Sequence, residues 1–147
     1  MPHPEPILDA VRTLGGARRV DLLHGGLAHY VARVQLNRGR TRDVILKRAL
    51  DSANHDAFFA ERGALATLRG RRVGPELLDV LPANECGGPV LVLAVIAGRE
   101  ARSTQALLDR SVDVGALLAR LHSTPLDAKH RRGLPRFPSL GEQAELG

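Results

Sequence analysis

The chain has 147 residues, 44% of them hydrophobic and 25% charged, which is typical of a globular protein of one domain or part of one. No apolar run approaches the ~18–20 residues that a membrane-spanning helix needs, so we expect no membrane partner. The N-terminus lacks a basic segment followed by an apolar one, which argues against a secretory signal. Cys86 is the single cysteine, so no disulfide forms within the chain, and this suits a cytoplasmic location.

The net charge of +5 raises the question of nucleic-acid binding. The arginines are scattered from Arg12 to Arg136 and cluster only in short pairs. One tyrosine and three phenylalanines are too few for a surface that stacks on bases. We therefore expect no nucleic-acid partner, and a basic surface fits a small polyanion such as a nucleotide equally well.

The first half of the chain predicts a helix followed by an antiparallel meander. Apolar residues recur at helical spacing over residues 5–14, and Gly15-Gly16 ends the helix. Three strands are expected over residues 20–23, 30–36 and 43–49. The second strand alternates apolar and polar residues, and Gly39 can supply a positive φ in the hairpin that leads to the third.

The second half predicts two more strands and three helices. The first helix begins at a cap on Ser52 or Asn54, runs to about Arg69 and ends at Gly70. Strands are expected within residues 73–81 and 89–98, a short helix after a cap at Ser103, and an amphipathic helix over 111–122 that stops before Pro125. The fold class is therefore α+β, with five strands in an antiparallel arrangement.

Lys47 is one of two lysines among 21 basic residues, and it closes an apolar strand. On a helical wheel of roughly 100° per residue, Glu61 lies within the apolar face that Phe58, Leu65 and Leu68 define. A carboxylate there is costly to desolvate unless it is paired, which predicts an ion pair between Lys47 and Glu61. The alternative is that Glu61 lies at the margin of the face while Lys47 extends to solvent.

Three further features suit a nucleotide. The Gly25-Gly26 turn joins the first two strands, where bare backbone N–H groups can approach a phosphate, although most such pairs only form a hairpin. The apolar strand that ends near Gly98 leaves backbone donors and acceptors at an edge, where they can contact a planar base. The compact ammonium of Lys47 suits point-charge contact with phosphate oxygens.

The ordered set of these segments resembles the N-terminal lobe of the aminoglycoside phosphotransferase and choline kinase family, relatives of the protein kinases. The segments that carry the resemblance are LLHGGLAHYVARV, VILKRA, FFAERGALATL, VGPELLDV, PVLVLAVIAG and VGALLARLHSTP, over residues 20–125. The resemblance implies a kinase-like nucleotide-binding lobe with one helix packed on the sheet over residues 1–98. A hinge and the first helices of an incomplete C-terminal lobe would follow over 99–125, and an irregular tail over 126–147.

The resemblance also implies roles for individual residues in binding ATP. The loop over the phosphates would consist of Gly25, Gly26, Leu27, Ala28 and His29. Lys47 would contact the α- and β-phosphates, and Glu61 would hold Lys47 through their ion pair. Leu93 to Ile96 would lead into the hinge, where the backbone of Ala94 and Ile96 would contact adenine.

The implied activity is transfer of the γ-phosphate of ATP to a hydroxyl group of a small molecule. The family's H-x-D-x-x-x-x-N segment and its later metal-binding aspartate are not found, since no asparagine follows His122. We therefore expect no catalytic or metal-binding residue in this chain, which would be an inactive fragment. Mg²⁺ is expected to bind only together with a missing C-terminal lobe. The alternative is a non-catalytic kinase-like module that binds a nucleotide or a partner. The apolar face of residues 112–122 is expected to drive self-association or to bind a complementary C-terminal lobe.

Overall fold

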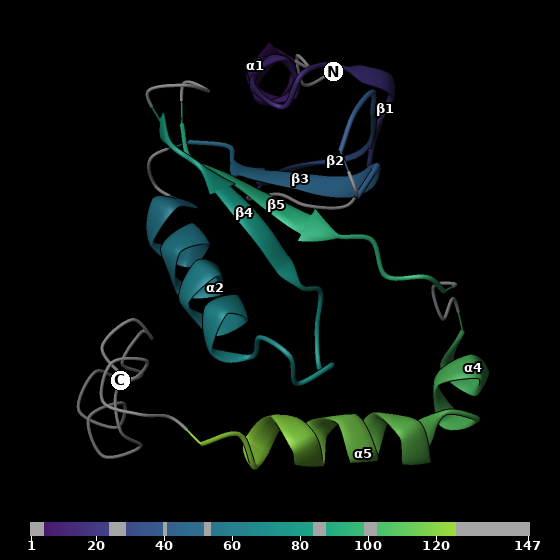
Figure 1. The fold of residues 1–147 in the computed structure, drawn as a ribbon. Coiled ribbons are helices and arrows are strands. Elements are labelled where there is room, and N and C mark those ends of the chain that lie inside the picture. The colour runs from purple at the N-terminus through teal and green to yellow at the C-terminus, as the bar shows by residue number, and fades with distance from the viewer. Residues whose placement is uncertain are drawn as a thin grey trace.

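The computed structural model describes residues 5–23, 29–39, 41–51, 54–83, 88–98 and 103–125. In chain order these form α1 (Glu5–Thr13), β1 (Ala17–Leu22), β2 (His29–Leu36), β3 (Asp43–Ala49), α2 (His55–Thr67), β4 (Leu77–Leu81), β5 (Val90–Ala94), α4 (Thr104–Leu108) and α5 (Ser111–His122). The five strands form one antiparallel sheet, so the predicted α+β class is confirmed (Figure 1).

The sheet has the strand order β1-β2-β3-β5-β4. The first three strands form the predicted meander, whereas β5 inserts between β3 and β4 and pairs with both. After β3 the chain forms α2 and returns to the sheet as the edge strand β4. It then forms β5, which lies between β3 and β4 (Figure 1). As a result β3 lies at the centre of the sheet, with β2 on one side and β5 on the other.

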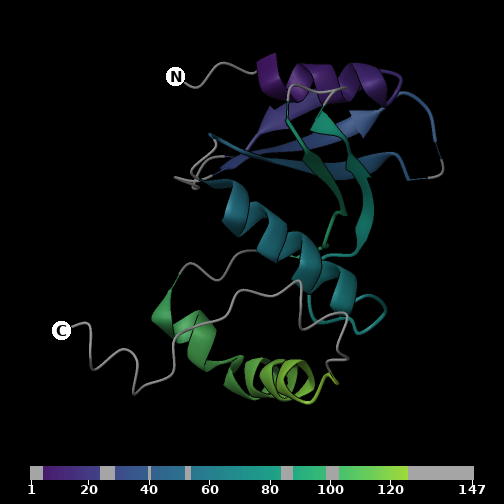
Figure 2. The same ribbon diagram turned by 90° about the vertical axis from the view of Figure 1, so that its left-hand side faces the viewer.

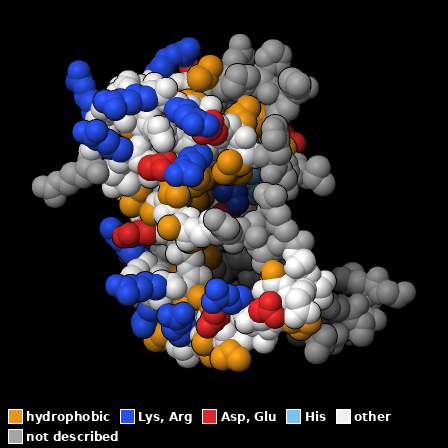
Figure 3. Space-filling view, turned by 90° about the vertical axis from the view of Figure 1, so that its right-hand side faces the viewer, with side chains coloured by type: hydrophobic (Ala, Val, Ile, Leu, Met, Phe, Trp, Pro, Cys, Tyr) orange, Lys and Arg blue, Asp and Glu red, His pale blue; other side chains and the backbone are white. Residues whose placement is uncertain are grey.

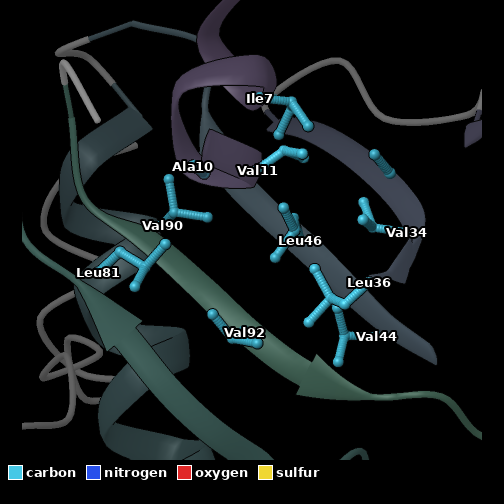
Figure 4. Packing of buried hydrophobic residues seen from close by; sticks show 11 residues of the cluster. Ile7, Ala10, Val11, Val34, Leu36, Val44, Leu46, Leu81, Val90 and Val92 are labelled. Atoms are coloured by element: carbon cyan, nitrogen blue, oxygen red, sulfur yellow. The ribbon is translucent and has the colours of Figure 1, made fainter. Parts of the chain in front are cut away.

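One face of the sheet is covered by α1 (Figure 4). Because side chains alternate along a strand, every second residue of β2, β3 and β5 faces this helix. The buried residues of this face are Ala32, Val34, Leu36, Val44, Leu46, Val90 and Val92, and they pack with Leu81 and with Ile7, Ala10 and Val11 of α1. We expected one helix packed on the sheet, and α1 is a second one. Its sequence pattern predicts a helix but does not specify what the helix packs against.

The opposite face of the sheet is covered by α2. Phe58 and Leu65 of this helix are buried against Ala49, Leu91 and Leu93. The β4–β5 register shifts between Leu77 and Asp79, and this bulge turns both Leu77 and Val80 toward α2 although they are three residues apart. Figure 2 shows α1, the sheet and α2 as successive layers, with α4 and α5 beyond α2.

The helix ends follow local chemistry that the sequence shows. After α1, the N–H groups of Gly15 and Gly16 donate to the carbonyls of Arg12 and Val11, each at 2.9 Å. Both glycines have positive φ, +86° and +85°, which side-chain-bearing residues rarely adopt. Before α4, the Ser103 hydroxyl accepts a hydrogen bond from the Ala106 N–H at 3.1 Å, as the predicted cap requires. Within the described part of the chain, no helix is both long and apolar enough to cross a bilayer.

Candidate functional site

The predicted ion pair between strand and helix is present in the structure. The Lys47 Nζ atom of β3 lies 2.6 Å from the Glu61 Oε2 atom of α2. The two side chains keep 21% and 29% of their surface exposed, so the pair is accessible from solvent. The alternative, in which Lys47 extends to solvent without a carboxylate partner, is therefore wrong.

The register of the sheet and the packing of α2 bring these two groups together. Lys47 pairs with Val31 of β2 and with Leu91 of β5, on the face of the sheet that α2 covers. Glu61 lies three residues after Phe58 and four before Leu65, and both apolar residues are buried against the sheet. Because these two residues are buried against the sheet, the Glu61 carboxylate between them also faces the sheet, as the helical spacing predicts.

The start of α2 differs from the predicted cap. Asn54 occupies the cap position, but its side chain makes no capping hydrogen bond. Instead, the Asp51 carboxylate accepts hydrogen bonds from the Asn54 backbone N–H at 3.1 Å and from Asn54 Nδ2 at 2.8 Å. Ser52, the other candidate, lies outside the described residues. An acidic residue three positions before the cap residue Asn54 is the signal that could have identified Asp51.

His29 is the first residue of β2 and lies on the same face of the sheet as Lys47. It pairs with Ala49, two residues beyond Lys47, while Val31 pairs with Lys47 itself. Its Nε2 atom is buried and has no hydrogen-bond partner among the described residues. Burial, and next the positive charge of Lys47, lower the pKa of His29 below 6.5, while Glu61 acts in the opposite direction.

The other loop residues expected over a phosphate, Gly25, Gly26, Leu27 and Ala28, lie outside the described residues. Val31 was not singled out by sequence reasoning, although it shares the face of His29 and Lys47. Residues two apart on a strand lie on the same face, so His29 and Val31 are neighbours on β2. That both lie beside Lys47 follows only from the β2–β3 register, which the sequence does not give.

The expected base-contacting segment begins at the end of β5. Leu93 is buried on the α2 face, and the chain continues in an extended course beyond the sheet to Ile96, which is 65% exposed. The Ala94 N–H donates to the Glu76 carbonyl at 2.9 Å, so this donor is engaged within the sheet. The Ala94 N–H is therefore not free to contact a base.

The charged surface around the sheet is of mixed sign. In Figure 3, lysine and arginine side chains are spread over the upper part of the molecule with carboxylates among them. Arg33 of β2 and Asp43 of β3 form an exposed pair, with Arg33 Nε 3.1 Å from Asp43 Oδ1. Their hydrogen bond lowers the pKa of Asp43 and raises that of Arg33. In the described ranges, no group of three histidine, cysteine or acidic side chains is arranged to hold a metal ion.

A second feature lies away from the sheet, between α4 and α5. These helices border an open hollow of ≈ 410 Å³, whose walls are mostly apolar. Its lining residues are Thr104, Leu107, Leu108, Ser111, Val114, Gly115 and Leu118. None of the described residues that line the hollow has an ionisable side chain, so they offer shape and apolar surface but no acid–base chemistry.

Comparison with known proteins agrees with this architecture. A model of a family described as the phosphotransferase enzyme family matches residues 20–145. Among solved structures, the chain is similar to a mutant of an aminoglycoside 2'-phosphotransferase IIIa in its GDP complex, with a TM-score of 0.67 and 13% identity. The similarity covers 97% of this chain and 49% of that one, so the chain spans about half the length of this relative. The shared fold is kinase-like, as the resemblance implied. No match is found among curated proteins.

Proposed function

Because this chain belongs to the phosphotransferase enzyme family, we propose that it is the ATP-binding part of a small-molecule kinase. Such an enzyme transfers the γ-phosphate of ATP to a hydroxyl group of its acceptor. The observation that carries the proposal is the ion pair of Lys47 and Glu61, held at 2.6 Å between the central strand and α2 and still accessible from solvent.

In this proposal Lys47 binds the α- and β-phosphates of the nucleotide. An ammonium group has three donors, and Glu61 needs only part of them, so the remainder can donate to phosphate oxygens. Glu61 fixes the direction of a flexible side chain before the ligand arrives, which reduces the conformational entropy that binding would otherwise cost. Neither group is deeply buried, so the ligand need not displace the core.

Further contacts to the nucleotide come from backbone groups on either side of Lys47. Contacts to the phosphates are assigned in this proposal to Gly25 and Gly26, followed by Leu27, Ala28 and His29. At the other end, the Ala94 carbonyl accepts a hydrogen bond from the adenine amino group, and the backbone of Ile96 supplies the second contact. The engagement of the Ala94 N–H by Glu76 is the reason for assigning the carbonyl.

Phosphate transfer needs groups that these 147 residues do not supply. The sequence has no H-x-D-x-x-x-x-N segment, from which this family draws the aspartate that orients the acceptor and the asparagine that holds Mg²⁺. We therefore propose that residues 1–98 form the nucleotide-binding lobe and residues 99–125 begin a second lobe. We also propose that this chain alone neither transfers phosphate nor holds Mg²⁺ without the rest of such a lobe.

The second candidate function is a non-catalytic module that binds a nucleotide or a partner. Adjacent coding sequence distinguishes the two: a segment encoding H-x-D-x-x-x-x-N favours the kinase, and its absence in every frame favours the module. The acceptor of the kinase is undefined because the second lobe forms most of its site in this family.

The ATP-binding proposal is tested by calorimetric titration of ATP into the wild-type chain and the Lys47→Ala variant. We expect the affinity to fall by about tenfold or more, because a charged hydrogen bond to phosphate is lost. Arg110→Ala is a matched control, since it removes the same charge from an exposed pair with Asp113 on α5. Equal affinities for wild type and Lys47→Ala would contradict the proposal.

A further inference from the structure

The Nε2 atom of His29, close to the ion pair, has no hydrogen-bond partner among the residues that the structure describes. Its Nε2 atom is buried although the residue as a whole is only half-buried. A buried polar atom that makes no hydrogen bond destabilises the folded chain, and such atoms are rare in proteins. A ligand that forms a hydrogen bond with this nitrogen would supply the partner that the described residues do not.

The charges that act on the imidazole come from the two neighbouring elements. Lys47 on β3 disfavours a positive charge on the ring, and Glu61 on α2 favours one. Burial acts together with Lys47, so the ring is neutral at neutral pH when the site holds no ligand. A polyanion bound at Lys47 would oppose the effect of the lysine and favour the protonated ring.

We propose that His29 is a phosphate-binding residue of this site, and that its Nε2 donates a hydrogen bond to an oxygen of the polyphosphate that Lys47 binds. This inference rests on the proposed function and adds a role in proton uptake. When the polyphosphate binds, the imidazole takes a proton from solvent and becomes an imidazolium, which donates from both ring nitrogens. The proton neutralises one negative charge of the ligand within the site.

The sign of the pH dependence follows from this role. The free site has a His29 pKa below 6.5, and the bound site has a higher one. Between these two values the complex holds one more proton than the free chain. Affinity contributed by His29 therefore rises as the pH falls through this window, by at most about tenfold per pH unit for one proton.

The test is calorimetric titration of ATP and of inorganic tripolyphosphate, without metal, from about pH 8 to about pH 6 in buffers of different ionisation enthalpy. Three proteins are compared: wild type, His29→Gln and His122→Gln. Glutamine keeps a donor that does not titrate, and His122 is an exposed histidine near the end of α5. Protonation of the ligand itself is the same for all three proteins, so their difference isolates His29.

We expect the wild type and His122→Gln to take up a fraction of a proton that His29→Gln does not. NMR titration of the His29 ring in the wild type gives a second readout that needs no variant, and its pKa should rise when tripolyphosphate is bound. Binding without either effect would overturn the role of His29 and leave the proposed function standing. No binding of ATP or tripolyphosphate to the wild type would overturn both.

Discussion

The Lys47–Glu61 contact matters more for geometry than for stability. Both side chains are partly exposed, so solvent screens their attraction, and pairs of this kind stabilise a fold by about 1 kcal/mol or less. Its value to a ligand is that the ammonium group is already positioned. The cost of removing the pair should therefore be small in unfolding and large in nucleotide binding.

A double-mutant cycle with Lys47→Met and Glu61→Gln measures the contribution of the pair to stability. We expect a coupling free energy of about 0.5–1 kcal/mol in urea unfolding, because two partly exposed charges interact over a short distance. Additive effects of the two substitutions would show that the contact contributes nothing to folding. A coupling of several kcal/mol would mean that the pair is far less screened than its exposure indicates.

Sequence alone identified Lys47 and Glu61 because their signals are local. One is a rare lysine at the end of an apolar strand, and the other is a carboxylate within an apolar helical face. That His29 Nε2 has no hydrogen-bond partner among the described residues could not be predicted in this way, since it depends on the β2–β3 register and on burial. The bond from Ala94 to Glu76 likewise depends on how β4 pairs with β5.

At the scale of elements, the two helices on the sheet have separate tasks. α1 packs on the face that carries no residue of the candidate ion pair, whereas α2 packs on the face of Lys47 and carries Glu61. The two helices can therefore be loosened one at a time. Ile7 in α1 and Phe58 in α2 are both fully buried, which makes them a matched pair of positions.

We predict that Ile7→Val and Phe58→Leu lower the free energy of unfolding by similar amounts, about 1 kcal/mol each. Only Phe58→Leu should weaken ATP binding, by about threefold or about 0.7 kcal/mol, because it loosens the helix that positions Glu61. Chemical denaturation and calorimetry on the same samples give both quantities. Equal loss of ATP affinity in the two variants would contradict the prediction. It would mean that affinity depends on the overall free energy of unfolding and not on the position of α2.

The elements themselves were largely predictable, and their arrangement was not. Strand β3 was predicted over the residues that form it, and α5 ends before Pro125 as expected. Strand β1 begins at Ala17, earlier than predicted, because exposed Arg18 and Arg19 obscure its pattern. The insertion of β5 between β3 and β4 joins segments far apart in the chain, and hydrophobic periodicity carries no information about such pairing.

At the scale of the whole molecule, α4 and α5 present apolar surface that the described residues leave uncovered. Leu108 is 60% and Val112 83% exposed, and Leu107, Val114, Leu118 and Leu121 are also exposed. Exposed apolar surface of this kind marks interfaces or causes association. We propose that it drives self-association, unless a complementary C-terminal lobe covers it.

Sedimentation over a range of concentrations tests this prediction with the variant Leu118→Glu. We expect the wild type to associate and the variant to shift toward monomer, because a carboxylate is costly to bury in an apolar contact. Leu78→Glu is the control, since Leu78 is an exposed leucine on β4 outside this surface. A wild-type chain that remains monomeric at high concentration would contradict the prediction.

The central claim is that Lys47 contacts the phosphates of a bound nucleotide. The most direct measurement uses an acyl-phosphate derivative of ATP, which transfers its acyl group to a lysine amine next to the phosphates, followed by peptide mass spectrometry. The chain suits this experiment because Lys47 and Lys129 are its only lysines. The account predicts acylation of Lys47 that excess ATP suppresses, with Lys129 modified equally in both cases. Modification of Lys47 that ATP leaves unchanged, or none at all, would contradict it.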